Sequence, residues 1–382
     1  MSLFFVTFFL AYGGMHLYAF LRARAALHFG FLPGLAAALF MTGMLFAPIV
    51  IRQAERRGLE EFARILSFVG YTWLGLLFLF CSASLVVDIY RLILRAAELV
   101  AHADYRHLKL GGRGIFYIPL VYAVLVAAYG YVDAKNIRIE TITIKTPKIP
   151  ASAGRLRIVQ ISDVHLGLII GEERLRNILS RVNEAGPDIL VSTGDLVDGQ
   201  ISDDMQGLAE MLSRFNPRYG KYAITGNHEF YAGLEQAIAF TRKSGFRILR
   251  NEAVDIGGVL TIAGVDDRAV RPLAATSDGA EQAMLSRLPR EKFTLLLKHR
   301  PLVNRGSAGL FDLQLSGHVH RGQIFPFSIL TKLYYPVHAG LADLDSGSRL
   351  YVSRGTGTWG PPIRFLSPPE ITVIDLLQSG PE

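Results

Sequence analysis

The stretch Arg155-Leu156-Arg157-Ile158-Val159-Gln160-Ile161-Ser162-Asp163-Val164-His165 begins the pattern that decides the fold. Its first seven residues are rich in β-branched and apolar side chains, which predicts a β-strand. Asp163 and His165 follow this strand on one face, because side chains alternate with period two along an extended chain. The strand therefore brings a carboxylate and an imidazole together to one end of a sheet.

Four later segments repeat this arrangement of a strand followed by side chains that can bind a metal. The segments are Gly194-Asp195-Leu196-Val197-Asp198, Gly226-Asn227-His228-Glu229, Lys298-His299-Arg300-Pro301 and Gly317-His318-Val319-His320. In open α/β architectures, ligands gather where loops leave the carboxyl ends of strands. We therefore expect one cleft to collect the first ligand-type residue of each segment.

The donor atoms in these segments indicate the kind of metal site. Carboxylate and amide oxygens occur with imidazole nitrogens and without thiolates, which favours two ions such as Mn, Fe or Zn over a structural zinc site. Each segment alone is weak evidence, and the two imidazoles of His318 and His320 are the strongest single signal. The one cysteine, Cys81, lies in an apolar run, so the chain has no disulfide framework.

The soluble part of the sequence alternates predicted strands and helices. A helix is expected over 172–185, where Gly186-Pro187 ends it. Further strands are expected at 188–192, 221–225, 259–263, 293–297, 312–315, 350–353 and 371–374. This many short strands in one domain predict an α/β fold with two packed sheets flanked by helices.

Residues 1–135 differ from the rest because they contain four long apolar runs. The runs are 3–21, 31–51, 65–87 and 114–132, and each is long enough to cross a bilayer as a helix, which takes about 20 apolar residues. We expect a multi-pass transmembrane domain over 1–135 and a soluble domain over 136–382. No basic residue precedes the first run, so a retained anchor is favoured over a cleaved signal peptide.

The segment 92–103, after the third run, is amphipathic. It is expected either to lie along the membrane interface or to extend the third helix. Lys and Arg number seven in the loops on one side of the membrane and eight on the other, so the positive-inside rule selects no orientation. The net charge of +7 comes largely from these loops, and no basic stripe interleaved with aromatics is present. Membrane lipids are therefore expected partners and nucleic acid is not.

The five segments, in this order and each after a predicted strand, resemble the calcineurin-like metallophosphoesterase superfamily over residues 137–382. The later stretches Ser353–Arg364 and Pro368–Ile371 are similar to its bacterial membrane-associated branch. The resemblance implies a four-layer α-β-β-α sandwich and a multi-pass protein of the bacterial inner membrane. It also implies activity on phospholipid-like or nucleotide-lipid phosphoesters.

The resemblance also implies a role for each matching residue. It assigns Asp163, His165 and His320 to a first ion, Asn227, His299 and His318 to a second, and Asp195 to both as a bridge. His228 would be catalytic without binding a metal, by stabilising the phosphoryl group or protonating the leaving oxygen. Two departures from the family pattern are Arg321, where many relatives have glycine, and Glu229, where aspartate is frequent.

The predicted function is hydrolysis of a phosphoester or pyrophosphate by metal-activated hydroxide, with a lipid-linked or envelope substrate. Soluble nucleotides or cyclic nucleotides are the alternative substrates. A scaffold that has lost its chemistry is disfavoured, since no ligand is missing. Arg300, Arg321 and Arg364 are either phosphate contacts or solvated surface arginines. Asp198, Asp266 and Asp267 are either partners that orient histidines or ordinary loop aspartates. The apolar segment 324–336 is expected either to form a lip beside the cleft or to pack into the core.

Overall fold

The computed structural model describes residues 3–202, 205–267, 276–344 and 346–380. The chain forms two compact units. The first, called the helical unit here, contains residues 1–132 and 360–365. The second, called the catalytic unit, contains residues 133–359 and 366–382. The sequence predicts a domain boundary between residues 135 and 136, and it does not predict the return of 360–365 to the first unit.

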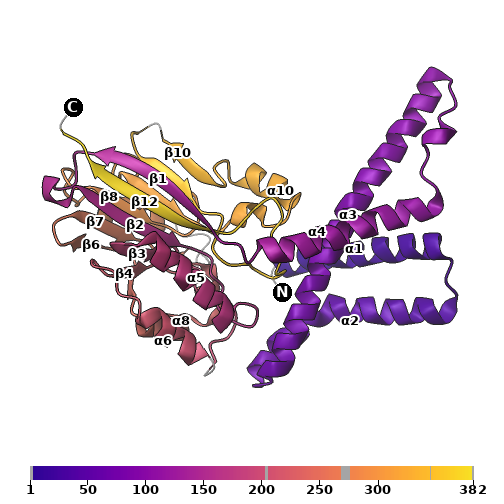
Figure 1. The fold of residues 1–382 in the computed structure, drawn as a ribbon, viewed down its shortest axis with the longest axis horizontal. Helices are drawn as coiled ribbons and strands as arrows, with labels where there is room; N and C mark the ends of the chain where they lie inside the picture. Colours follow the sequence, from indigo (N-terminus) through magenta and orange to yellow (C-terminus); the bar gives the residue numbers. More distant parts are fainter. Residues whose placement is uncertain (1–2, 203–204, 268–275, 345, 381–382) are drawn as a thin grey trace. The chain divides into compact units, whose positions relative to one another are not determined.

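Four long α-helices make up the helical unit (Figure 1). They are α1 (Leu3–Leu27), α2 (Phe31–Arg56), α3 (Glu60–Ala101) and α4 (Gly112–Asp133), with the short 3-10 turn η1 (Arg106–Leu108) before α4. The candidate membrane spans in the described chain lie in Phe31–Arg56, Glu60–Ala101 and Arg106–Asp133. The predicted span 3–21 lies within α1, which is not among these three candidates, so that fourth span stays a prediction.

α3 is longer than a single membrane span requires. Its 42 residues correspond to about 63 Å at 1.5 Å per residue, about twice the thickness of a bilayer core. The helix runs without a break through residue 101. Of the two expectations for 92–103, the extension of the third helix is therefore the one found.

The segment Gly360–Phe365 is packed against α3 and α4 within the helical unit. A Cβ atom added to Gly75 would lie 2.8 Å from Ile363, and one added to Gly130 would lie 2.6 Å from the same side chain. The backbone N–H of Arg364 donates a hydrogen bond to the carbonyl of Gly130 at 3.0 Å. The two glycines thus provide the space in which this returning segment lies.

The first sheet of the catalytic unit has six strands in the order β1-β12-β2-β3-β4-β5. They are β1 (Arg138–Thr146), β12 (Glu370–Gln378), β2 (Arg155–Ile161), β3 (Ile189–Ser192), β4 (Lys221–Ala223) and β5 (Arg247–Ile248). The pairs from β2 to β5 are parallel, and β12 is antiparallel to β2 and parallel to β1. Parallel order brings the carboxyl ends of β2, β3 and β4 to one edge.

The second sheet has six strands in the order β10-β11-β9-β8-β7-β6. They are β10 (Gly340–Asp343), β11 (Arg349–Val352), β9 (Leu313–Ser316), β8 (Thr294–Leu297), β7 (Leu260–Gly264) and β6 (Glu252–Ile256). Its four central strands are parallel, and β6 and β10 close its two edges in antiparallel pairing.

Alternation along the strands produces the layers of the catalytic unit. In β2, Ile158 packs into the core between the sheets, whereas Val159 packs into the core under α5 (Glu172–Ala185), α6 (Gln206–Ser213) and α8 (Leu234–Lys243). In β8, Leu296 faces outward against Leu285 of α9 (Thr276–Leu285). The predicted fold class is confirmed: apolar helices are followed by two mixed sheets with helices on their outer faces.

The strands predicted with chemistry at their ends lie where the sequence places them, within a residue or two, and α5 has the predicted bounds. The strands that the sequence did not predict are β1, β5, β6 and β10. All four lie at or beside a sheet edge, where one strand face is solvated and the apolar alternation that reveals a strand is weaker.

Candidate metal centre

The five loops predicted to carry ligands meet at the carboxyl ends of strands from both sheets. Loops after β2 and β3 carry Asp163, His165 and Asp195, and Asn227 begins the short helix α7 (Asn227–Ala232) after β4. From the second sheet, His299 follows β8, and β9 leads into the segment with His318 and His320. The seven side chains, spread over more than 150 residues of sequence, come together in one cluster.

The backbone of this cluster is held in an uncommon conformation. Left-handed φ angles between 45° and 72° occur at six of its residues, namely Asp163, His165, Asp195, His318, His320 and Arg321. Such angles are rare outside glycine and cost of order 1 kcal/mol or more each. Strain of this kind gathers at functional sites, because it points side chains where regular structure would not.

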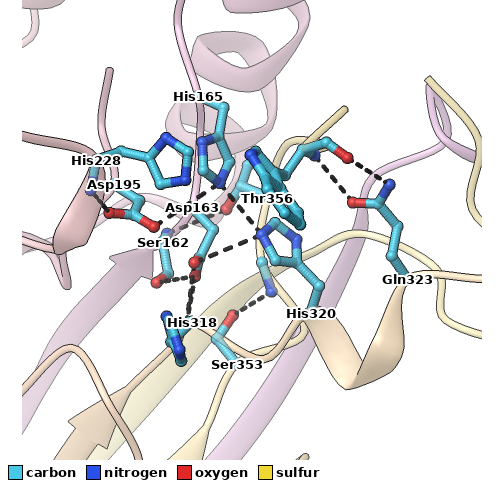
Figure 2. Close-up of polar contacts among 12 residues, drawn as sticks. Ser162, Asp163, His165, Asp195, His228, His318, His320, Gln323, Ser353 and Thr356 are labelled. Carbon is cyan, nitrogen blue, oxygen red and sulfur yellow. Dashed lines mark hydrogen bonds and ion pairs between the residues drawn. The ribbon is translucent and has the colours of Figure 1, made fainter. Parts of the chain in front are cut away.

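The first group of ligand-type atoms consists of Asp163, His165 and His320. Nε2 of His165 lies 3.2 Å from Nε2 of His320, and the latter lies 3.6 Å from Oδ1 of Asp163. Figure 2 shows these rings and the carboxylate turned toward one another. Burial, followed by the charge of His228, lowers the pKa of His165 to about 4, so its ring is neutral at pH 7, the form that binds metals.

The second group consists of Asp195, His299 and His318, with Asn227 beside them. Nδ1 of His299 lies 2.8 Å from the carbonyl of Thr193, and its Nε2 faces Oδ2 of Asp195 at 3.2 Å and Oδ1 of Asn227 at 3.3 Å. Nδ1 of His318 is 3.2 Å from the same Nε2. Asp195 also lies 4.0 Å from His165, between the two groups.

These residues fit divalent ions. Because Nδ1 of His299 donates to Thr193, its Nε2 faces the two oxygen atoms, and either a proton or a cation is needed between them. Burial disfavours charge on His299, but the carboxylate of Asp195 outweighs burial and raises the pKa of His299 to about 10. The same carboxylate would attract a divalent cation. Nδ1 of His165 is buried without a hydrogen-bond partner. Mixed oxygen and imidazole donors of this kind suit Mn, Fe or Zn.

Glu229 positions the loop that carries Asp195, a role the sequence did not suggest. Its buried side chain accepts hydrogen bonds from the backbone N–H groups of Asp195 at 3.0 Å, Leu196 at 2.8 Å and Gly226 at 2.6 Å. The loop after β3 is thereby fastened to the start of α7. The available signal was its place directly after Asn227-His228, three residues into a helix start.

His228 lies beside the cluster and is held by a carboxylate of its own. Its Nδ1 is 2.8 Å from Oδ1 of Asp198, and its ring contacts the ring of Trp359 with centroids 5.9 Å apart. Burial disfavours its charged form, but Asp195 and Asp198 outweigh burial and raise its pKa to about 9. His228 also lies within ligand distance of His165 and Asp195. It can therefore present a proton to the site.

The other residues predicted to support the site have different surroundings in the structure. Arg300 lies beside the second group and is held by Asp267, with Nε 2.8 Å from Oδ2. Arg321 directly follows His320 in the strained turn. Asp266 instead pairs with Arg250 at 2.8 Å and orients no ligand. Arg364 belongs to the helical unit, and its side chain is fully buried.

Close backbone approach makes two glycines necessary at the cluster. A Cβ atom at Gly317 would lie 1.9 Å from Oγ of Ser162, and one at Gly226 would lie 2.2 Å from Oδ1 of Asp195. Ser162 in turn donates to Asp163 at 2.5 Å, and the backbone N–H of His318 donates to the same carboxylate at 2.9 Å. Sequence reasoning missed Ser162 and Thr193, since a lone hydroxyl residue at a strand end carries no signal.

The two-sheet fold and this cluster define a metal-binding hydrolase of the phosphoesterase class. Residues 156–322 match the family described as calcineurin-like phosphoesterase. A protein of Aquifex aeolicus called "Uncharacterized metallophosphoesterase" is 41% identical over 260 residues, which are 68% of this chain and 98% of that protein. The chain belongs to the calcineurin-like metallophosphoesterase family, whose members use divalent metals.

Two further relatives extend over more of the chain. A zebrafish (Danio rerio) protein named "Transmembrane protein with metallophosphoesterase domain" is 34% identical over 74% of this chain and 66% of its own length. A Campylobacter jejuni protein named "Uncharacterized metallophosphoesterase Cj0846" is 33% identical over 81% of this chain and 83% of its own length. The chain is thus a metallophosphoesterase with apolar helices long enough to cross a membrane.

Proposed function

We propose that this chain is a membrane-anchored phosphoesterase that holds two divalent ions and hydrolyses a lipid-linked or envelope phosphoester or pyrophosphate. The observation that carries the proposal is the position of Asp195 between two groups of ligand-type side chains. In this proposal Asp163, His165 and His320 hold one ion, and Asn227, His299 and His318 hold the other. The carboxylate of Asp195 would be shared by both.

Two adjacent divalent ions, when bound, supply Lewis acidity toward the phosphoester and lower the pKa of water. The residues of the chain do the rest. Glu229 and Thr193 fix Asp195 and His299 through buried hydrogen bonds, so the ligands need no reorganisation. His228, oriented by Asp198, donates its proton to the leaving oxygen. Arg300, oriented by Asp267, contacts the phosphoryl group.

The membrane part of the proposal is supported by the helices of the same chain. Three helices have the length and composition of membrane spans, and a relative carries the word transmembrane in its name. A phosphoester borne by a lipid is the substrate that such a tether brings close to the site. The bacterial inner membrane is the proposed location. Soluble nucleotides, including cyclic ones, are the alternative substrates. An inactive scaffold is disfavoured because the sequence retains a ligand-type residue at all seven positions.

The experiment compares the full-length protein with Asp195→Ala. Both are loaded with Mn, Fe or Zn and assayed in detergent and in lipid discs on lipid phosphomonoesters, lipid diesters, lipid pyrophosphates, nucleotides and cyclic nucleotides. We expect Asp195→Ala to lose about a thousandfold or more in turnover and to bind less metal by elemental analysis, because it removes the group shared by both ions.

The matched control is Asp343→Ala, which removes an aspartate whose side chain is 83% exposed. It should keep both metal content and turnover. Near-normal turnover by Asp195→Ala would contradict the metal assignment. Turnover limited to nucleotides, equal with and without lipid, would favour the alternative substrates.

A further inference from the structure

The helix α10 (Phe327–Tyr334) in the catalytic unit has its apolar side outward. Phe327, Leu330 and Tyr334 lie at spacings of three and four, next to Ile329 and Leu333, and therefore form one broad face. These five side chains belong to residues that are 46–78% exposed, whereas Ser328 and Thr331 on the other side are partly buried. A helix of a soluble domain ordinarily buries its apolar face and exposes its polar one.

Most of the exposed large apolar residues described in the catalytic unit lie on this helix or directly before it. Among the described residues of the unit, ten large hydrophobic residues are exposed, and nine of them lie within 325–366. Six of the nine belong to the short stretch 325–334. A contiguous apolar surface of this kind marks an interaction site. We call the face formed by Phe327, Ile329, Leu330, Leu333 and Tyr334 the α10 face.

The α10 face is fastened directly to the metal centre. A Cβ atom at Gly322, two residues after His320, would lie 2.4 Å from the backbone of Ser328, so the turn that carries His320 is packed on the start of α10. At the other end of the helix the buried Tyr335 contacts the ring of His318, with centroids 5.8 Å apart. A partner held on this face is therefore beside the ligands.

The charge around the α10 face indicates the kind of partner. Residues 321–342 contain no Asp or Glu, and they contain Arg321, Lys332 and His338. Arg321 and Lys332 are close enough to His338 to act on it electrostatically, so the basic groups lie together. Apolar side chains edged by basic groups match the boundary of an anionic bilayer, where acyl chains meet negative headgroups.

The size of the surface argues against a second copy of the chain. A stable protein interface engages about 20–30 residues on each side, and an eight-residue helix offers far fewer. Shallow insertion of one short amphipathic helix into a bilayer requires no larger area. A bilayer is also the surface that the candidate spans of the same chain require.

We propose that the α10 face inserts into the headgroup boundary of an anionic phospholipid bilayer and holds the metal centre at the level of lipid phosphates. This rests on the proposed function only for its consequence, which is that a lipid-borne phosphoester reaches the ligands without leaving the membrane. The insertion itself can be measured without any turnover.

A fluorescent label at the α10 face tests the insertion. Cys81 is the one native cysteine, so the full chain with Cys81→Ser accepts a single labelled site. Leu333→Cys and the control Lys243→Cys, an exposed position on α8, are labelled with bimane and placed in discs of phosphatidylcholine with phosphatidylglycerol. We expect a blue shift and quenching by doxyl-labelled lipid at position 333 and neither at 243.

Three results would overturn the insertion. The first is a label at 333 that aqueous iodide quenches as readily as the label at 243. The second is protection at 333 without quenching by doxyl lipid, which would mean that protein covers the face. The third is protection that appears in detergent and grows with protein concentration, which would identify a second copy as the occupant.

Kinetics test the consequence separately. The double variant Leu330→Ser with Leu333→Ser should raise KM for a phosphatidic acid substrate in discs about tenfold and leave kcat/KM for a soluble p-nitrophenyl phosphoester unchanged. Lys332→Gln should weaken the preference for anionic over neutral discs about fivefold, and the control Lys243→Gln should not. Equal losses on both substrates would contradict the α10 proposal. A protein that hydrolyses neither substrate would contradict the proposed function and leave the label result to decide insertion.

Discussion

The helical unit and the catalytic unit differ in how many large apolar residues they expose and in how closely their glycines are packed. Of the 45 exposed large hydrophobic residues described, 35 lie in the helical unit, which contains the helices that are long and apolar enough to cross a membrane. Several glycines there, such as Gly14 and Gly43, have open space where a side chain would be. In the catalytic unit, Gly226 and Gly317 have none. Apart from the glycines that pack on the returning segment 360–365, the helical unit thus has surfaces that tolerate change, whereas the metal-ligand loops of the catalytic unit depend on close approach at glycine.

The largest effect that this comparison predicts is that of Gly317→Ala. The added methyl group would overlap Oγ of Ser162 and Oδ2 of Asp163, at 1.9 and 2.2 Å, so the loop with His318 and His320 must move. We expect turnover to fall at least about a hundredfold, because a shift of 1 Å in catalytic groups has that effect. Elemental analysis should show reduced metal content. Gly14→Ala, with nothing near its side-chain position, is the control and should be silent in both measurements.

Metal withdrawal should separate the two units thermodynamically. Ions that bind only the folded catalytic unit stabilise it by about 2.7 kcal/mol at a hundred times their Kd. Chelation should therefore lower the unfolding temperature reported by an intrinsic probe in the catalytic unit. The unfolding temperature of the helical unit, followed by the loss of helix content in circular dichroism, should stay unchanged. Equal shifts in both transitions would show that the ions do not act through the cluster.

Gly130→Leu tests whether the returning segment 360–365 links the two units along the chain. The larger side chain would displace Ile363 and the backbone of Arg364. Trp359, immediately before this segment, contacts the ring of His228. The backbone N–H of Trp359 donates a hydrogen bond to Oε1 of Gln323 at 2.9 Å. We expect kcat to fall about tenfold, which is part of the roughly hundredfold or more that a well-positioned general acid contributes. Gly14→Leu is the control, and equal activity of the two variants would refute the link.

The sequence was sufficient for the parts of the fold in which local pattern and chemistry coincide. The strand Arg155–Ile161 and the helix Glu172–Ala185 have strong periodicity and clear end signals, and both were predicted with their observed bounds. The position of Asp163 and His165 at a strand end followed from the same pattern. Their chemistry indicated a metal site, whereas their assignment to one particular ion came from the resemblance and remains a prediction.

What the sequence did not reveal depends on contacts distant along the chain. β1 was missed because it is an edge strand with few buried positions, and the strand that stabilises it, β12, lies more than 200 positions away. Glu229 looked like a departure from a family pattern, and only the fold shows its three backbone partners on the loop after β3 and at Gly226. The segment 360–365 carries no local signal that assigns it to the helical unit. Such facts belong to the tertiary structure.

The two units also differ in the burial of their ion pairs. Asp88→Ala tests the partly buried pair of the helical unit. Arg22 pairs with Asp88, and Tyr18 donates to the same carboxylate at 2.6 Å. Arg22 also donates to the carbonyls of Ser84 and Ile115, so this one side chain joins three helices. We expect a loss of about 2 kcal/mol in the stability of the helical unit, because a charged hydrogen-bonded group loses its partner. Thermal unfolding in detergent measures it, and an unchanged transition would refute the role of the pair.

The smallest effect should come from the corresponding change in the catalytic unit, Glu172→Ala. Glu172 and Arg176 are paired at 2.5 Å in the first turns of α5, but both side chains are about two-thirds exposed. Water already solvates each charge, so the pair and the favourable position of Glu172 near the helix start together contribute less than about 1 kcal/mol. Thermal unfolding of the catalytic unit should therefore shift less than that of the helical unit does in Asp88→Ala. A larger shift for Glu172→Ala would mean that burial does not set the strength of ion pairs in this protein.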